Sequence, residues 1–242
     1  MEAIEKSGSM NIVDLCSGAG IPVITVLNEL AEQKDNKLHV TLTDKYPNIA
    51  EFRHLGEKHK DKVNCIEDPV EADRVSDNLK GFRTLFGSFH HFNKETARKI
   101  LLDAVLKNEG IGIFEYTERN FLAWGLALLL TPAFIMLSTP FIRPFSFRRF
   151  LWMLIIPVVP FVAAWDGFVS CLRTYSTIEL RNLAASLGTS GYRWETGRIR
   201  SFGGCYITFL IGYPVSSGYQ GGSTWTAEAP RPPAAGEPQV AI

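Results

Sequence analysis

The stretch from Val13 to Pro22, which reads VDLCSGAGIP, contains the features that decide the fold. It begins in a short apolar run, residues 11–15, that is typical of a buried strand. After it, apolar residues recur at the spacing of one helix face: Val23, Val26, Leu27 and Leu30. Gly18 and Gly20 permit a tight turn between the two, and Pro22 suits a first helical turn. The stretch therefore predicts a strand, a glycine turn and a helix, a unit that binds nucleotides in many α/β proteins.

The same alternation continues along the chain. Further strands are predicted at four places: residues 38–42, 63–66, 82–86 and 111–115. Asn93 is a predicted helix N-cap, and the segment after it has one apolar face and ends near Gly110. Strands that alternate with helices indicate a parallel, doubly wound sheet, whose ligands bind at the carboxyl ends of the strands.

The pattern resumes after a long interruption. Ser176 and Glu179 have the spacing of a capping box, so a helix is predicted after Ser176. Residues 192–199 and 205–211 are predicted to form a closing hairpin at one edge of the sheet. From Pro214 the chain is rich in Gly, Ser, Pro and Ala, and we expect a disordered tail over 214–242.

Composition restricts the partners and the compartment. The 242 residues contain 25 basic and 25 acidic side chains, and this balance does not indicate a nucleic-acid partner. The four cysteines form no CxxC pair, and the first ten residues lack the apolar core of a signal peptide. His39, His54 and His59 form no ligand pattern, so no metal site is predicted. We therefore expect a cytoplasmic location.

The acids beside the glycine turn indicate which nucleotide it holds. A dinucleotide fingerprint requires a third glycine, and Val23 occupies that position. Asp14, at the end of the first strand, would repel phosphates but attract a ligand with an ammonium and a sulfonium. Asp44 ends the second strand, where it can accept hydrogen bonds from ribose hydroxyls. A nicotinamide cofactor is therefore disfavoured.

Several phrases extend this pattern, namely VTLTDKYPN (40–48), RTLFGSFHHF (83–92) and IGIFEYTER (111–119). With the glycine turn and its two acids, the sequence resembles the class I S-adenosylmethionine-dependent methyltransferases over residues 11–119, and more weakly over 176–213. The resemblance implies a three-layer, Rossmann-like α/β sheet of about seven strands, the last two forming a hairpin. It also implies S-adenosyl-L-methionine as the cofactor. The apolar residues between strand five and Ser176 add a hydrophobic helical insertion to this fold.

The resemblance also implies a cofactor site of eight residues: Asp14, Cys16, Gly18, Gly20, Asp44, Tyr46, Glu71 and Ser88. In this site Asp14, Gly18 and Gly20 meet the methionine end. Asp44 and Tyr46 meet the ribose and adenine. Cys16 stands where many relatives have glycine. For the acid beside the adenine, Glu67 and Asp68 remain alternatives to Glu71.

The candidate catalytic residues are His90 and His91, which follow strand four on the rim of the expected site. Methyl transfer from a sulfonium is an in-line displacement, so a base is needed only when the acceptor must lose a proton. A histidine can serve as that base near neutral pH. Alternatively, one histidine packs against the next helix and the other faces solvent. Glu115, which ends strand five, is expected either to contact substrate or to be an ordinary strand-end acid.

The interruption between strand five and Ser176 contains two charge-free apolar segments, residues 121–141 and 150–165. The first is long enough to cross a bilayer and the second is short for that purpose. A membrane hairpin would place Arg143, Arg148 and Arg149 outside, against the positive-inside tendency. We therefore favour a segment that lies in the membrane interface, with a hydrophobic lid or dimer surface as the alternative.

Together these features predict a cofactor-binding part over 1–119, the insertion over 120–175, and the final helix and hairpin over 176–213. The predicted function is a methyltransferase that acts on a small or lipid-like apolar acceptor at a membrane surface. The alternative is a membrane-associated binding protein that has the methyltransferase fold but no transfer activity. The sequence leaves the oligomeric state open.

Overall fold

A computed structural model describes residues 2–33, 38–117, 121–142, 145–155, 157–201, 206–215 and 225–226. The chain divides into two compact units. The sheet unit comprises Met1–Tyr116 and Tyr175–Ile242, and the helical unit comprises Thr117–Thr174. Each unit is described by itself below.

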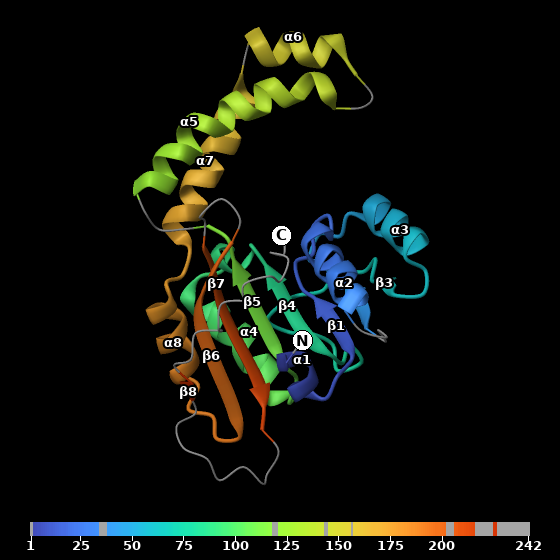
Figure 1. Ribbon diagram of the computed structural model, residues 1–242, viewed down its shortest axis with the longest axis vertical. Coiled ribbons are helices and arrows are strands. Elements are labelled where there is room, and N and C mark those ends of the chain that lie inside the picture. The colour runs from blue at the N-terminus through green and yellow to red at the C-terminus, as the bar shows by residue number, and fades with distance from the viewer. Residues whose placement is uncertain are drawn as a thin grey trace. The chain divides into compact units, whose positions relative to one another are not determined.

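The sheet unit is built on one mixed β-sheet (Figure 1). Its strands are β1 (Asn11–Asp14), β2 (His39–Leu42), β3 (Val63–Cys65), β4 (Phe82–Phe86), β5 (Ile111–Glu115), β6 (Tyr192–Arg200), β7 (Tyr206–Pro214) and β8 (Trp225–Thr226). The spatial order is β3-β2-β1-β4-β5-β7-β6-β8. Strands β1 to β5 are parallel, whereas β7 runs antiparallel to both β5 and β6. The predicted closing hairpin is confirmed. It consists of β6 and β7, and β7 is the strand of the two that pairs with β5.

The expected disordered tail lies mostly outside the described residues. Pro214, its first residue, still belongs to β7. Within the tail the structure describes the two-residue strand β8, which pairs in parallel with β6 and adds an eighth strand to the expected seven.

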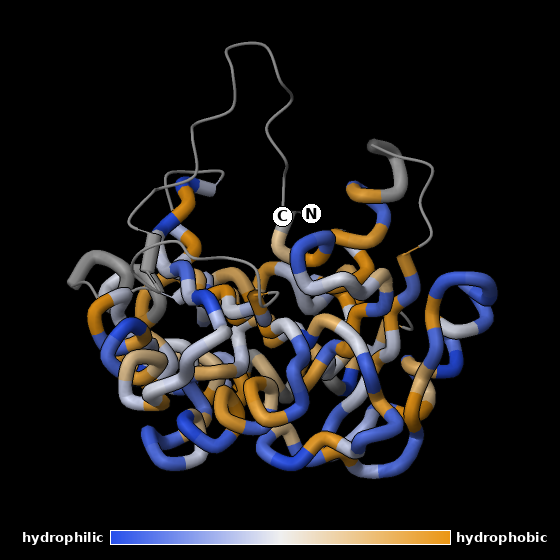
Figure 2. The backbone as a smooth tube through the Cα atoms, turned by 90° about the horizontal axis from the view of Figure 1, so that it is seen from below, coloured by the Kyte–Doolittle hydropathy of each residue, from blue (hydrophilic) through white to orange (hydrophobic). Residues whose placement is uncertain are grey.

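Helices cover both faces of the sheet and make three layers. These are α1 (Glu2–Ser7), α2 (Ile21–Gln33) and α3 (Ile49–Lys58) on one face, and α4 (Lys94–Leu106) and α8 (Thr177–Ala185) on the other. Neighbouring residues of β1 serve different faces: Ile12 packs in the cluster under α2 and α3, and Val13 packs under α4. In Figure 2 hydrophilic segments lie mostly at the periphery, and apolar segments lie between them.

The predicted helix caps are present. Asn93 accepts a hydrogen bond from the Thr96 amide at 2.9 Å and begins α4. Ser176 and Glu179 form both hydrogen bonds of a capping box at the start of α8. These short-range signals therefore fix where two of the covering helices begin.

The helical unit consists of α5 (Phe121–Ser138), the 3-10 helix η2 (Thr139–Phe141), α6 (Phe147–Ile155) and α7 (Val158–Arg173). Helices α5 and α7 lie side by side, and α6 contacts α7 (Figure 1). The hydroxyl of buried Thr139 donates to the Ile135 carbonyl at 2.6 Å, and its oxygen also lies 2.8 Å from the Met153 sulfur, so η2 contacts α6. Thr117 and Thr174 are the first and last residues of the unit, and their hydroxyls are hydrogen bonded to each other.

Many apolar side chains of the helical unit face outward. Eight of them are between 62% and 80% exposed: Leu129, Phe134, Leu137, Phe141, Phe147, Ile155, Phe161 and Trp165. Within the described part of the chain, no helix combines the length and the apolar character needed to cross a membrane.

Candidate cofactor site

The order in which successive strands are added to the sheet reverses between β1 and β4. The candidate site lies at the ends of these two strands. Strands β2 and β3 extend the sheet on one side of this pair, and β5 extends it on the other. In open α/β sheets such a switch point leaves a crevice at the carboxyl ends of the strands. Asp14 ends β1 and is paired in register with Thr84 of β4. The glycine turn follows the first strand and Ser88 follows the second, so both border this crevice.

The glycine turn is a tightly wound loop. Cys16, Gly18 and Gly20 all have a left-handed backbone, with φ values of 59°, 54° and 69°. A side chain on Gly20 would come within 2.8 Å of the Leu55 Cδ1 atom, whereas one on Gly18 would meet nothing within 4 Å. Cys16 thus occupies a left-handed position of the kind that favours glycine.

Asp44 holds the tip of the turn. Its Oδ2 accepts a hydrogen bond from the Gly18 amide at 2.9 Å, and its Oδ1 accepts one from the Tyr46 amide at 2.8 Å. Each carboxylate oxygen retains a further acceptor lone pair. The structure therefore brings Asp44 and Gly18 together as the sequence predicts, with acceptor capacity left for a ligand. The Tyr46 ring is 80% exposed and lies at the rim.

Asp14 is buried under this turn. Its Oδ1 accepts a hydrogen bond of 2.6 Å from the Thr84 hydroxyl. Burial raises the pKa of Asp14 to about 7, although the Thr84 hydrogen bond opposes the shift. Burial likewise raises the pKa of the Cys16 thiol to about 12, with Asp44 and Asp14 adding to the effect. The thiol is thus neutral near pH 7, while Asp14 can gain or lose its proton there.

The turn after β4 is organised by Glu115, the last residue of β5. Its Oε1 accepts hydrogen bonds from the Phe89 amide at 2.7 Å and the His90 amide at 3.3 Å. Its Oε2 lies 2.7 Å from His90 Nδ1. Glu115 is fully buried and His90 is 4% exposed. The carboxylate therefore fixes both the backbone and the imidazole of the 3-10 helix η1 (Phe89–His91).

The two candidate histidines differ in their surroundings. The His90 ring is buried against Glu115, whereas His91 is exposed, and the two ring centroids are 4.3 Å apart. A hydrogen bond from Nδ1–H to Glu115 leaves Nε2 of His90 as the acceptor nitrogen. His90 thus has the arrangement of an oriented base.

Ser88 carries a buried polar atom that calls for a partner. Its Oγ atom lies beside the Cys16 thiol, a weak hydrogen-bonding group, and has no other partner among the described residues, although Ser88 is only 9% exposed. Ser88 follows β4 and Cys16 follows β1, so the two residues lie where these neighbouring strands end. Native structures rarely leave such an atom unsatisfied, so it fits a site in which a ligand supplies the partner.

The acids proposed for the adenine end are distinguished by their contacts. Glu67 forms two hydrogen bonds of 2.7 Å with Arg53 of α3. Glu71 forms an ion pair of 3.0 Å with Lys45, the residue that follows Asp44. The Val70 amide donates to the Asp44 carbonyl at 2.9 Å, which holds the Glu71 segment beside the end of β2. Glu71 is thus held beside the end of β2, whereas Glu67 is paired with α3.

Two residues of the site gave no signal in the sequence. Thr84 is an interior strand residue, and only the β1–β4 register places its hydroxyl on Asp14. Tyr116 covers Gly87, where an added Cβ would come within 2.2 Å of the ring. Gly87 has a left-handed φ of 56°, which only the structure reveals.

No protein-family model and no curated protein matches the chain. Similar solved structures include LaPhzM, with a TM-score of 0.51 and 15% sequence identity. The match covers 86% of this chain and 51% of LaPhzM. The neocarzinostatin O-methyltransferase NcsB1, in complex with S-adenosylmethionine, has a TM-score of 0.48 and 11% identity over 88% and 51% of the two chains. A protein from Rhodobacter sphaeroides assigned to the Zn-dependent alcohol dehydrogenases has a TM-score of 0.49 and 14% sequence identity. This match covers 85% of this chain and 84% of that one.

The position of β7 distinguishes this sheet from a dinucleotide-binding sheet. Dinucleotide-binding sheets have the order 3-2-1-4-5-6. Here the antiparallel β7 is inserted between β5 and β6. The fold is that of the class I S-adenosylmethionine-dependent methyltransferases. The chain spans about half the length of LaPhzM and of NcsB1.

Proposed function

We propose that this protein is an S-adenosylmethionine-dependent methyltransferase. The observation that carries the proposal is the placement of two acids and the glycine turn at the β1–β4 switch point, where Asp44 already holds the Gly18 amide. Phosphates would meet the carboxylates of Asp14 and Asp44 there. A cofactor with an ammonium, a sulfonium and an uncharged ribose fits better.

The residues present fit this cofactor. Asp14 would face the ammonium end, Asp44 would accept from the ribose hydroxyls, and Ser88 would find a partner for its buried hydroxyl. Glu71 and Tyr46 would border the adenine. When bound, the cofactor supplies a methyl group on a sulfonium, which an acceptor attacks in line.

His90 is the proposed base. Glu115 accepts a hydrogen bond from its Nδ1 and holds the η1 backbone, so Nε2 is left to take a proton from an acceptor hydroxyl or amine. His91, exposed beside it, is proposed to contact the acceptor at the rim.

We further propose a small or lipid-like apolar acceptor and a membrane surface as the place of action. The outward apolar side chains of the helical unit support this, because so many exposed large apolar side chains in one small unit are unusual on a monomer in water. A hollow of about 490 Å³ between α5 and α7 is lined by Leu128, Phe161, Val162, Ala164 and Trp165. Arg148 is exposed on α6, where it can meet anionic headgroups.

Calorimetric titration with S-adenosylhomocysteine, and in parallel with NADH, tests the cofactor. We expect micromolar binding of the first and none of the second. Failure of S-adenosylhomocysteine to bind would remove the methyltransferase proposal. Binding without transfer of a labelled methyl group to any apolar phenol, quinol or extracted lipid would favour the binding protein with no transfer activity.

Histidine variants then test the base. His90→Gln is expected to lower kcat at least about hundredfold, the usual contribution of a positioned base. His91→Gln should change KM more than kcat. The affinity for S-adenosylhomocysteine serves as the folding control in both variants, and an unchanged kcat in His90→Gln would exclude His90 as the base.

A further inference from the structure

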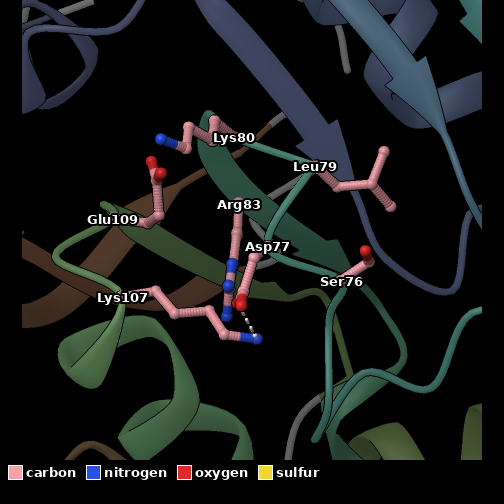
Figure 3. A pocket seen from close by; sticks show the side chains of 7 residues that line it. All are labelled: Ser76, Asp77, Leu79, Lys80, Arg83, Lys107 and Glu109. Atoms are coloured by element: carbon pink, nitrogen blue, oxygen red, sulfur yellow. Dashed lines mark ion pairs between the residues drawn. The ribbon is translucent and has the colours of Figure 1, made fainter.

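A second polar pocket lies away from the candidate cofactor site. It has a volume of about 230 Å³ and is lined by Ser76, Asp77, Leu79, Lys80, Arg83, Lys107 and Glu109 (Figure 3). Lys80 precedes β4 and Glu109 precedes β5, so the pocket borders the amino ends of these strands. The cofactor site borders their carboxyl ends, at the opposite edge of the sheet.

Arg83 is the residue that distinguishes this pocket. The side chain is 0% exposed, and its Nη1 donates to Asp103 Oδ2 at 2.7 Å. Its Nε and Nη2 are buried and have no hydrogen-bond partner in the described ranges. Unsatisfied buried donors are costly, and charged ones most of all. The Nε–Nη2 edge of a guanidinium matches two oxygens of one phosphate or carboxylate.

Two lysines add positive charge around Arg83, and two carboxylates, Asp77 and Glu109, also line the pocket. Lys107 Nζ lies 3.0 Å from Asp103 and 3.3 Å from Asp77, and it also donates to the Val75 carbonyl. Lys80 is exposed at the mouth. Figure 3 marks the ion pair between the Asp77 carboxylate and Lys107. Asp77 is 87% exposed, so its ion pair contributes little and can open easily.

We propose that this pocket binds a small anion through a phosphate group, with Asp77 as the carboxylate that it displaces. The phosphate oxygens satisfy the free edge of Arg83, and Lys107 and Lys80 neutralise their charge. A volume of about 230 Å³ is below the range of drug-sized ligands, which favours free phosphate or a small monoester. This site is independent of the proposed methyl transfer.

Titration of the full chain with inorganic phosphate, and separately with glycerol phosphate, tests the proposal at constant ionic strength. We expect saturable binding of one anion per chain, and the tighter of the two anions identifies a free phosphate or a monoester as the ligand class. Asp77→Ala should tighten binding and Lys80→Gln should weaken it, each by about two- to fivefold, the size expected for one partly exposed charge.

Lys58→Gln is the matched control, because Lys58 is exposed on α3 and loses the same charge away from the pocket. Arg83→Met would break a buried ion pair and threatens the fold, so the test depends on the exposed residues. Absence of saturable binding would overturn the proposal. Equal affinities in the wild type, Lys80→Gln, Asp77→Ala and Lys58→Gln would also overturn it.

Discussion

The sheet unit and the helical unit are both rich in apolar residues, but they place them in opposite ways. In the sheet unit, strand residues alternate between two buried clusters, and polar groups gather where the strands end. In the helical unit, Leu129 and Leu137 are each 73% exposed on α5. Of the 26 large apolar side chains that are exposed in the described ranges, 17 belong to the 58-residue helical unit.

The difference is one of burial: the sheet unit covers its apolar side chains, and the helical unit leaves many of them exposed. Apolar area removed from water stabilises a fold by about 25 cal/mol per Å². The sheet unit gains this stabilisation from its own three layers. The helical unit leaves much of it unrealised, and a membrane surface would supply the missing burial.

The largest expected effect tests this contrast directly. Leu129→Ser with Leu137→Ser should weaken binding to vesicles of phosphatidylcholine and phosphatidylserine about hundredfold or more, since burial of each leucine contributes ~1.5–3 kcal/mol. The measurement is co-flotation with vesicles over a range of lipid concentrations.

The sheet unit offers a matched control for that double variant. Leu106 and Ile178 are 75% and 68% exposed on α4 and α8. Leu106→Ser with Ile178→Ser should leave vesicle binding unchanged. Equal losses in both double variants, or a wild-type protein that never floats, would contradict the membrane proposal.

The next effect sharpens the role of the polar strand ends. Asp44→Ala should weaken S-adenosylhomocysteine binding at least tenfold, about 1.4 kcal/mol, because ribose hydroxyls would lose their acceptor and the Gly18 amide its partner. Calorimetry measures the affinity. Glu67→Gln changes an acid that is paired with Arg53 and should bind as the wild type does. An unchanged affinity in Asp44→Ala would remove Asp44 from the site.

The sequence predicted the sheet unit well, because strand alternation and helix caps are local signals. Asn93 and Ser176 mark helix starts through contacts only three residues away. Glu115 was ambiguous, since its bond to His90 joins two strand ends that are 25 residues apart. Thr84 and Tyr116 gave no signal, because their contacts depend on strand register. The pocket around Arg83 was missed for the same reason.

The helical unit was less predictable in detail. Its apolar segments were evident, but apolar runs carry no register, and residues 150–165 are divided between α6 and α7 around residues 156–157. A uniformly apolar helix also gives no indication of which face it exposes.

A smaller effect concerns the packing of the glycine turn. Gly20→Ala and Gly18→Ala both place a side chain on a left-handed backbone, at a cost of roughly 1–2 kcal/mol. Only the Gly20 variant also meets Leu55, and overpacking adds about 1–3 kcal/mol. Thermal unfolding should therefore show a Tm lowered by several degrees more in Gly20→Ala, and equal Tm values would contradict the described turn.

The smallest effect is a fraction of one proton. The pKa of Asp14 is raised from 3.8 to about 7, so the native protein holds this proton more tightly than the unfolded chain. Its contribution to stability is greatest below pH 4, falls as the pH rises from 4 to 7, and is constant above that range.

A bound ammonium would lower the pKa of Asp14, although Asp44 nearby opposes ionisation. Near pH 7 binding of S-adenosylhomocysteine should therefore release about half a proton, measured as a dependence of the binding enthalpy on the buffer. Asp14→Asn should abolish the release while Thr84 keeps an acceptor at the same place, and a release that persists in this variant would assign the proton to another group.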